Sequence, residues 1–204
     1  MSDTNDVSLT LLLGGVRAGK SARALQLADA RSGSEPSANV LFVATAQAFD
    51  AEMQRRISAH RAERPETWNT IEEPLALADA IRLSLMQHPS TRVVVIDCIT
   101  LWVSNLLLTH LEHDNIEQFV GDETRALLHT MQHHAATATP SGEVPREWII
   151  VSNEVGLGIV PPTPLGRQYR DALGRANQLL AAAANEVTLL VAGLELPLKH
   201  TRPI

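Results

Sequence analysis

The residues with the clearest chemical meaning are 14–21, which read Gly-Gly-Val-Arg-Ala-Gly-Lys-Ser and complete the pattern G-x-x-x-x-G-K-[ST]. An apolar run over residues 8–13 precedes them and a helix-forming stretch over residues 22–30 follows, which is the context of a phosphate-binding loop. In such a loop, backbone N–H groups and the helix N-terminus surround the phosphates, the lysine reaches the β- and γ-phosphates, and the serine hydroxyl can ligate Mg²⁺. The alternative is a plain glycine turn between a strand and a helix. We predict a nucleoside-triphosphate site in which Lys20 binds phosphate and Ser21 helps to hold Mg²⁺.

Asp97 offers a carboxylate for the same metal ion, because it ends the apolar run over residues 92–96. An aspartate after a row of apolar β-forming residues has the form of a Walker B acid, which can hold Mg²⁺ or its water shell. The alternative role is to cap a helix that begins near Thr100. We predict the metal role, since the phosphate loop requires a carboxylate nearby.

His60 lies in a segment, residues 52–65, that is denser in charge than its surroundings. On a helix, Arg56 and His60 share one face and Met53 and Ile57 share another, so one face can pack while the other presents a histidine between arginines. A neutral imidazole is a competent nucleophile at phosphorus. The chain has eight histidines, however, and its residues alone leave His60 open between a nucleophile and a solvated surface side chain.

These residues need a framework that brings strand ends together. Apolar runs typical of buried strands cover residues 8–13, 40–44, 92–96, 148–151 and 187–191, and helical patterns cover residues 50–61, 74–86, 100–111, 116–136 and 166–184. This alternation predicts an α/β fold with a mostly parallel central sheet flanked by helices, in which ligands gather at the carboxyl ends of the strands. The polar residues just past the strands are therefore site candidates: Thr45, Gln47, Asp97, Asn153 and Glu154. Residues 137–146 are expected to form an exposed loop.

Length and composition narrow the class of protein further. The 204 residues suit a single nucleotide-binding domain over residues 1–204, with residues 1–7 disordered and residues 194–204 forming a tail. The formal net charge of −6 gives no general basic field for nucleic acid, and we expect no nucleic-acid partner. We find neither a signal peptide nor an apolar stretch of membrane-spanning length, so we expect a cytoplasmic protein. The one cysteine, Cys98, is expected to be a buried packing residue and not a reactive thiol.

Several segments together resemble one known family. They are the phosphate loop, Val-Ala-Thr-Ala at 43–46, His60-Arg61 through Arg64-Pro65, Glu-Glu-Pro-Leu at 72–75, Asp-Cys-Ile-Thr-Leu-Trp at 97–102, Ser-Asn-Glu-Val-Gly-Leu-Gly-Ile-Val-Pro at 152–161, and Tyr-Arg-Asp at 169–171 through Gly-Arg-Ala-Asn-Gln at 174–178. Over residues 9–193, in one register, the chain resembles the bifunctional adenosylcobinamide kinase/adenosylcobinamide-phosphate guanylyltransferases of cobalamin assembly. The resemblance implies a P-loop NTPase (RecA-like) fold.

The resemblance also implies two reactions on a corrinoid. The enzyme phosphorylates adenosylcobinamide with ATP or GTP, and then transfers GMP from GTP onto that phosphate through a guanylylated histidine, with Mg²⁺ as cofactor. The family's histidine matches His60. Some relatives carry two adjacent histidines, whereas position 59 is Ala59 here, and many carry serine where this chain has Ala18. A homo-oligomer, commonly a trimer, is also implied.

The family's nucleotide-contacting positions carry over to the phosphate loop and to four further segments. In this sequence they are Gly14, Gly15, Val16, Arg17, Ala18, Gly19, Lys20, Ser21, Thr45, Ala46, Gln47, Arg61, Ala62, Glu63, Arg64, Glu72 and Asp97. Glu72 suits the N1–H and amine of guanine, although it can equally be an acidic residue at a helix start.

Other functional candidates stay unassigned, and two alternative functions stay open. Glu154 can order a metal-bound water or the corrinoid hydroxyl, or simply be solvated, and the arginines Arg167, Arg170 and Arg175 can bind phosphate or pair with Asp171. Trp68 and Trp102 are expected to pack, not to stack on a corrin. The alternatives are a small-molecule kinase without nucleotidyl transfer and a nucleotide-controlled binding module.

Overall fold

The computed structural model describes residues 7–33, 39–48, 50–113, 115–139 and 142–201. The element order is β1 (Ser8–Gly14), α1 (Lys20–Arg31), β2 (Val40–Ala44), α2 (Ala51–Ala62), β3 (Asn69–Glu72), α3 (Leu77–Gln87), β4 (Val93–Asp97), α4 (Ile99–Thr109), α5 (Ile116–His133), β5 (Ala136–Thr139), β6 (Gly142–Pro145), β7 (Glu147–Val151), α6 (Pro164–Ala183), β8 (Glu186–Val191) and β9 (Leu194–His200). Residues 1–6, most of the segment that we expected to be disordered, lie outside the described residues.

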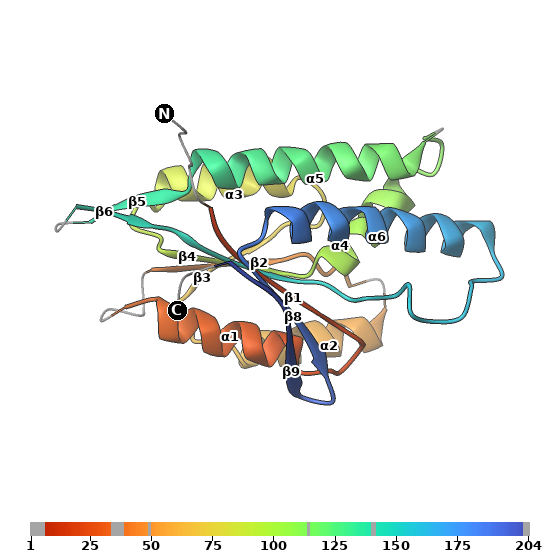
Figure 1. Ribbon diagram of the computed structural model, residues 1–204, viewed down its shortest axis with the longest axis horizontal. Helices are drawn as coiled ribbons and strands as arrows, with labels where there is room; N and C mark the ends of the chain where they lie inside the picture. The colour runs from red at the N-terminus through yellow and green to blue at the C-terminus, as the bar shows by residue number, and fades with distance from the viewer. Residues whose placement is uncertain (1–6, 34–38, 49, 114, 140–141, 202–204) are drawn as a thin grey trace.

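A seven-stranded sheet in the order β3-β2-β4-β7-β1-β8-β9 runs through the middle of the molecule (Figure 1). All neighbouring strands pair in parallel except β8 and β9, which are antiparallel. The central strands are continuous apolar runs because both of their faces are covered. The predicted α/β fold with a mostly parallel sheet flanked by helices is confirmed.

The helices form a layer on each side of the sheet. Figure 1 shows α1 and α2 on one face and α3, α4, α5 and α6 on the other. Two clusters of buried side chains fill the spaces between the layers. One joins the sheet to α3–α6 around Trp102 and Trp148, and the other joins it to α1 around Phe42 and Ala24. Trp68 and Trp102 are both buried, as we expected for packing residues.

The sheet register aligns the strand ends that were predicted to carry the site. Glu72 at the end of β3 is level with Ala44, Ala44 is level with Asp97, and Asp97 is level with Val151. The carboxyl ends of β3, β2, β4 and β7 therefore form one edge, and the phosphate loop follows β1 at the same edge.

Four expectations were wrong about elements at the borders of the fold. Residues 137–146 do not form a loop: β5 and β6 pair as an antiparallel hairpin, with Ala136 opposite Pro145. Residues 194–200 are not a tail, because they form β9 against β8. The short strand β3 had no counterpart among the predicted strands, and α5 ends at His133, before the expected residue 136. The last three residues, 202–204, lie outside the described part of the chain.

Candidate active site

The phosphate loop joins β1 to α1 through backbone that only certain residues tolerate. Gly14 has φ +150° and lies so close to β8 that a Cβ there would overlap the carbonyl oxygen of Leu190. Gly19, at the start of α1, has φ +98°, in the left-handed region that glycine adopts without strain. Arg17 is also left-handed, at φ +61°. These turns place the N-terminus of α1 at the carboxyl edge of the sheet, where its free N–H groups suit a phosphate.

Lys20 is poised inside this loop. Its side chain is 7% exposed, and Nζ donates a hydrogen bond to the Gly15 carbonyl oxygen at 2.6 Å. Burial lowers the pKa of Lys20, while the nearby Cys98 and Asp97 act in the opposite direction. A partly desolvated ammonium group held by a single carbonyl can turn readily to a phosphate, so the geometry fits the predicted role of Lys20.

Asp97 lies at the centre of the charged groups. Burial raises the pKa of Asp97, and the neighbouring Ser21 hydroxyl, His60, Arg64 and Lys20 act in the opposite direction. A hydroxyl and a carboxylate oxygen side by side are the hard donors that Mg²⁺ accepts. No group of three or more histidine, cysteine or acidic side chains suited to a metal occurs within the described ranges, so phosphate and water oxygens would have to complete the shell.

The structure brings His60 to this cluster through α2. The helix begins after Asp50, whose carboxylate accepts a hydrogen bond from the Met53 N–H at 2.7 Å, and His60 lies in its last turn. The charge of His60 is near enough to lower the pKa of Asp97. The imidazole is half exposed, and its Nδ1 is 3.6 Å from Oε2 of Glu63. The ring nitrogens of His60 are therefore accessible, and its charge is felt at Asp97.

The arginines that follow His60 take two different places. Arg64 is half-buried, with Cζ 3.8 Å from the centroid of the Phe42 ring. Burial lowers the pKa of Arg64, and the charges of Asp97 and Glu72 act against this shift. Arg61 is more exposed, and its Nη1 is 3.6 Å from Oε1 of Glu72. Arg64 thus faces the phosphate side of the site, and Arg61 and Glu72 form its outer rim. Ala62 and Glu63 are exposed at the end of α2.

Thr45 has a structural role that the sequence did not reveal. Its side chain is fully buried, donates a hydrogen bond to the Cys98 carbonyl oxygen at 2.7 Å, and accepts one from the Cys98 N–H at 2.8 Å. The hydroxyl therefore ties β2 to the residue after Asp97 and is not free for a nucleotide. Ala46 and Gln47, just beyond it, are partly exposed.

Two buried asparagines, which sequence reasoning missed, hold the loops of the site. Asn105 donates from Nδ2 to the carbonyl oxygens of Thr45 at 2.8 Å and Pro74 at 3.2 Å. Asn177 accepts from the Ser152 hydroxyl at 2.7 Å and donates to the Asn153 carbonyl oxygen at 3.0 Å. The sequence could have indicated them, because each is a polar amide on the otherwise apolar face of a helix that packs against the core.

Some of the remaining candidate residues hold loops in place, and others lie on surfaces away from the phosphate loop. The backbone N–H of Glu154 donates to the Gly14 carbonyl oxygen at 3.2 Å, and its carboxylate accepts from the Gly156 N–H. Arg167 donates to the carbonyl oxygens of Pro161 and Pro162, and Arg170 pairs with Asp171. Arg175 instead lines a groove of about 290 Å³ between α5 and α6. Burial raises the pKa of Cys98 to about 12, which keeps it a neutral thiol, as expected for a packing residue.

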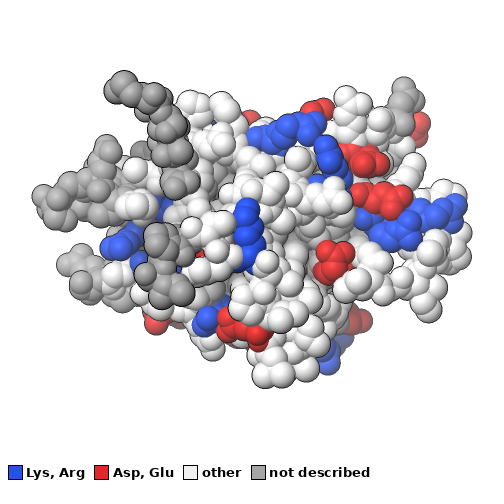
Figure 2. All heavy atoms as spheres, in the orientation of Figure 1, with Lys and Arg blue, Asp and Glu red and all other residues white. Residues whose placement is uncertain are grey.

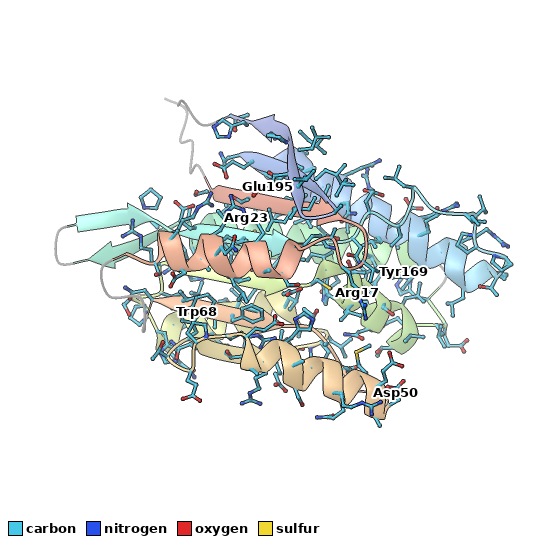
Figure 3. The ribbon with its side chains drawn as sticks, turned by 90° about the horizontal axis from the view of Figure 1, so that it is seen from below. Arg17, Arg23, Asp50, Trp68, Tyr169 and Glu195 are labelled. Carbon is cyan, nitrogen blue, oxygen red and sulfur yellow. The ribbon has the colours of Figure 1, made fainter. Side chains whose placement is uncertain are left out.

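The surface of the molecule carries charges of both signs. Figure 2 shows Lys and Arg intermixed with Asp and Glu on the visible face. Figure 3 shows Arg17 of the phosphate loop, Asp50 at the start of α2 and Tyr169 of α6 toward the same end of the molecule. No helix within the described residues is long and apolar enough to span a bilayer.

A phosphate loop on a parallel sheet flanked by helices defines a P-loop nucleotide-binding protein. The crystal structure of flagellar accessory protein FlaH from Methanocaldococcus jannaschii has a similar fold, with a TM-score of 0.50 and 14% sequence identity over 95% of this chain and 78% of that one. Within this class, the chain belongs to the cobinamide kinase / cobinamide phosphate guanyltransferase family, whose model matches residues 10–198.

Relatives named as bifunctional adenosylcobalamin biosynthesis proteins support this membership. CobP of Pseudomonas aeruginosa is 44% identical, covering 93% of this chain and 96% of its own length. CobU of Escherichia coli is 38% identical, covering 94% of this chain and 99% of its own length. The resemblance read from the motifs is confirmed, and the match extends past residue 193 into β9. The chain is thus a cobinamide kinase and cobinamide-phosphate guanylyltransferase of cobalamin biosynthesis.

Proposed function

We propose that both reactions use the one site described above, with Lys20 serving phosphoryl transfer and His60 carrying GMP. The observation that supports this most directly is that His60, Lys20, Ser21 and Arg64 all lower the pKa of Asp97, which ends β4 at the same edge of the sheet as the phosphate loop. The kinase step takes the γ-phosphoryl group of ATP or GTP to the terminal hydroxyl of adenosylcobinamide. The second step takes GMP from GTP to the new phosphate and gives adenosylcobinamide-GDP and pyrophosphate.

In the kinase step the protein positions the phosphates and balances their charge. The loop amides and the N-terminus of α1 bind the phosphate oxygens, and Lys20 leaves the Gly15 carbonyl to contact the β- and γ-phosphates. Ser21 and Asp97 would hold Mg²⁺, which would supply neutralisation of phosphate charge. The acceptor oxygen bonds to the γ-phosphorus as the P–O bond to the β-phosphate breaks. The nucleoside diphosphate leaves with the electron pair of that bond, and the hydroxyl proton passes to water.

In the transfer step a ring nitrogen of His60 bonds to the α-phosphorus of GTP as the P–O bond to the β-phosphate breaks. Pyrophosphate leaves with the electron pair of that bond, and Lys20 and Arg64 are placed to offset its charge. An oxygen of the corrinoid phosphate then attacks the same phosphorus, the P–N bond breaks, and His60 is regenerated. Two displacements allow one nucleotide site to serve two acceptors in turn.

We propose that the outer rim of the site, formed by Arg61 and Glu72, selects guanine. The Glu72 carboxylate is exposed, and its described ion-pair partner is Arg61, also exposed, at 3.6 Å. A carboxylate accepts hydrogen bonds from both the N1–H and the amine of guanine, which adenine cannot offer in that arrangement. Glu72 would thus bind the base, while Arg61 orients it.

The state of assembly is part of the same proposal. We infer that residues 1–204 act as one nucleotide-binding domain within a homo-oligomer, with a trimer as the expected form. Leu194, Leu196 and Leu198 of β9, together with Val191, are each more than half exposed on the edge of the sheet, which is a surface suited to contact between copies. Sedimentation equilibrium gives the subunit count directly.

A pair of variants tests the division of labour. His60→Ala should convert adenosylcobinamide to its phosphate and stop there, whereas Lys20→Ala should fail already at phosphorylation. His129→Ala, an exposed histidine on α5, is the matched control and should complete both steps. Products are identified by mass. If His60→Ala still forms adenosylcobinamide-GDP at the wild-type rate, the covalent route is wrong. If the folded wild type phosphorylates adenosylcobinamide but transfers no GMP, the chain is a kinase alone.

A further inference from the structure

The two ring nitrogens of His60 have different surroundings. Nδ1 faces the carboxylate of Glu63, one helical turn further along the chain, at 3.6 Å from Oε2. The charge of His60 also lowers the pKa of Asp97, the aspartate at the end of β4. A neutral imidazole carries its proton on only one nitrogen, and the partner of that N–H decides which nitrogen is left with a free electron pair.

The neighbouring arginines have other carboxylates besides Glu63. Arg61 pairs with Glu72, and Arg64 lies over the Phe42 ring, where Asp97 and Glu72 raise its pKa more than Glu63 does. The ion pair described for Glu63 is the one with His60. Both side chains are about half exposed, so either can adjust to a bound nucleotide.

We propose that Glu63 is a positioning residue that holds the Nδ1–H of His60, so that Nε2 is the atom that bonds to the α-phosphorus of GTP. This inference rests on the proposed role of His60 as the carrier of GMP. The Nε2–P bond forms as the P–O bond to pyrophosphate breaks, and the proton stays on Nδ1. The ring in the adduct then bears a positive charge, which the Glu63 carboxylate offsets.

The same contact accounts for onward transfer. A phosphoramidate whose distal nitrogen keeps its proton has a neutral imidazole as its leaving group, so the corrinoid phosphate can displace it without an added acid. A carboxylate that orients a catalytic imidazole and stabilises its charged form is a recurring arrangement in enzymes. A purely structural pair on the surface would contribute little to stability, and it would not choose between the nitrogens.

The test compares Glu63→Ala and Glu63→Gln with Glu66→Ala, an exposed acidic residue just beyond α2 that serves as the control. Each protein is mixed with Mg²⁺ and a saturating concentration of GTP labelled at the α-phosphate. The rate of adduct formation is measured in a single turnover, and the bonded nitrogen is identified by NMR of the labelled histidine peptide. Thermal unfolding of each variant confirms that it is folded.

We expect the wild type and Glu66→Ala to form the Nε2 adduct alone. Glu63→Ala should form adduct about 10–100-fold more slowly, the usual loss for an orienting partner, with part of it on Nδ1. Glu63→Gln keeps a hydrogen-bond acceptor, so it should keep Nε2 selectivity while losing rate. A wild-type rate with pure Nε2 adduct in Glu63→Ala, or a wild-type adduct on Nδ1, would overturn the inference. Absence of any adduct on wild-type His60 would instead refute the proposed carrier itself, and this inference with it.

Discussion

The replacement Thr45→Val separates a structural role from a nucleotide contact. Valine matches threonine in shape but has no hydroxyl, so it removes both hydrogen bonds between Thr45 and Cys98, at 2.7 and 2.8 Å. The Cys98 N–H and carbonyl oxygen would then lack these partners at the place where β2 meets the end of β4. Asp97 immediately precedes Cys98, so its position depends on the same contact.

The cost can be worked from these two bonds. A buried polar group left without its partner costs about 1–3 kcal/mol, and the extra methyl group returns about 0.8 kcal/mol. Because Cys98 is only half-buried and its carbonyl oxygen still accepts a hydrogen bond from the Trp102 N–H at 3.2 Å, we take the lower part of that range and expect a loss of about 1–2 kcal/mol. For a protein of this size that corresponds to a fall in Tm of roughly 2–8 °C. Turnover should also fall, since Asp97 loses its fixed position.

The assay is thermal unfolding followed by GTP binding and kinase turnover below the Tm of the variant. Thr45→Ser keeps the hydroxyl and should remain close to wild type in binding, whereas Thr70→Val, at an exposed position on β3, controls for the substitution itself. If Thr45→Val keeps the wild-type Tm but binds GTP more weakly, the side chain contacts nucleotide and the structural account is wrong.

Three further predictions concern stability and the phosphate loop. Arg146→Met should lower the free energy of unfolding by about 2–4 kcal/mol in chemical denaturation. The buried guanidinium, whose pKa burial lowers to about 10, donates to the backbone carbonyl oxygens of Pro89 and Thr91, which follow α3, and of His134 at the end of α5. Asp97→Asn should abolish Mg²⁺-dependent turnover yet raise the Tm of the nucleotide-free protein at neutral pH. Burial raises the pKa of Asp97, so its ionised form opposes folding, and the Tm difference should shrink as pH falls through that raised pKa. Gly14→Ala should displace the loop from Leu190 and abolish GTP binding in calorimetry, whereas Gly174→Ala, on α6 with no atom within 4 Å of the added Cβ, should be silent.

The parts of the fold that the sequence predicted are those set by local pattern. Continuous apolar runs marked the buried parallel strands, and the glycines around Lys20 marked the phosphate loop. The sequence did not predict β3 and β9, because these strands are stabilised by pairing with neighbouring strands and not by a local pattern. β9 contains Pro197 and is exposed along most of its length, so its residues show no buried pattern, and its pairing with β8 is set by the tertiary fold. β3 has only four residues.

The sequence suggested the chemically active residues of the site, but not the residues that hold them in place. The motifs pointed to Lys20, Asp97 and His60. In the structure Asp97 ends β4, Lys20 begins α1 after the phosphate loop, and the charges of Lys20 and His60 both lower the pKa of Asp97. Their scaffold, in contrast, depends on contacts between residues far apart in the chain, such as Asn105 with Thr45 across 60 positions. No spacing rule in a single sequence encodes such a contact. The hydrogen bond of the Thr45 hydroxyl to the Cys98 backbone, across 53 positions, is another contact of this kind.

The most direct test of the central claim is to incubate the folded wild-type protein with Mg²⁺ and GTP labelled at the α-phosphate, and then to map the label by mass after denaturation. The account predicts one GMP group on His60, labile in acid and stable in base as a phosphoramidate is, which passes to adenosylcobinamide phosphate when that acceptor is added. A protein that binds GTP but forms no adduct, or a His60→Ala variant that still transfers GMP, would contradict it.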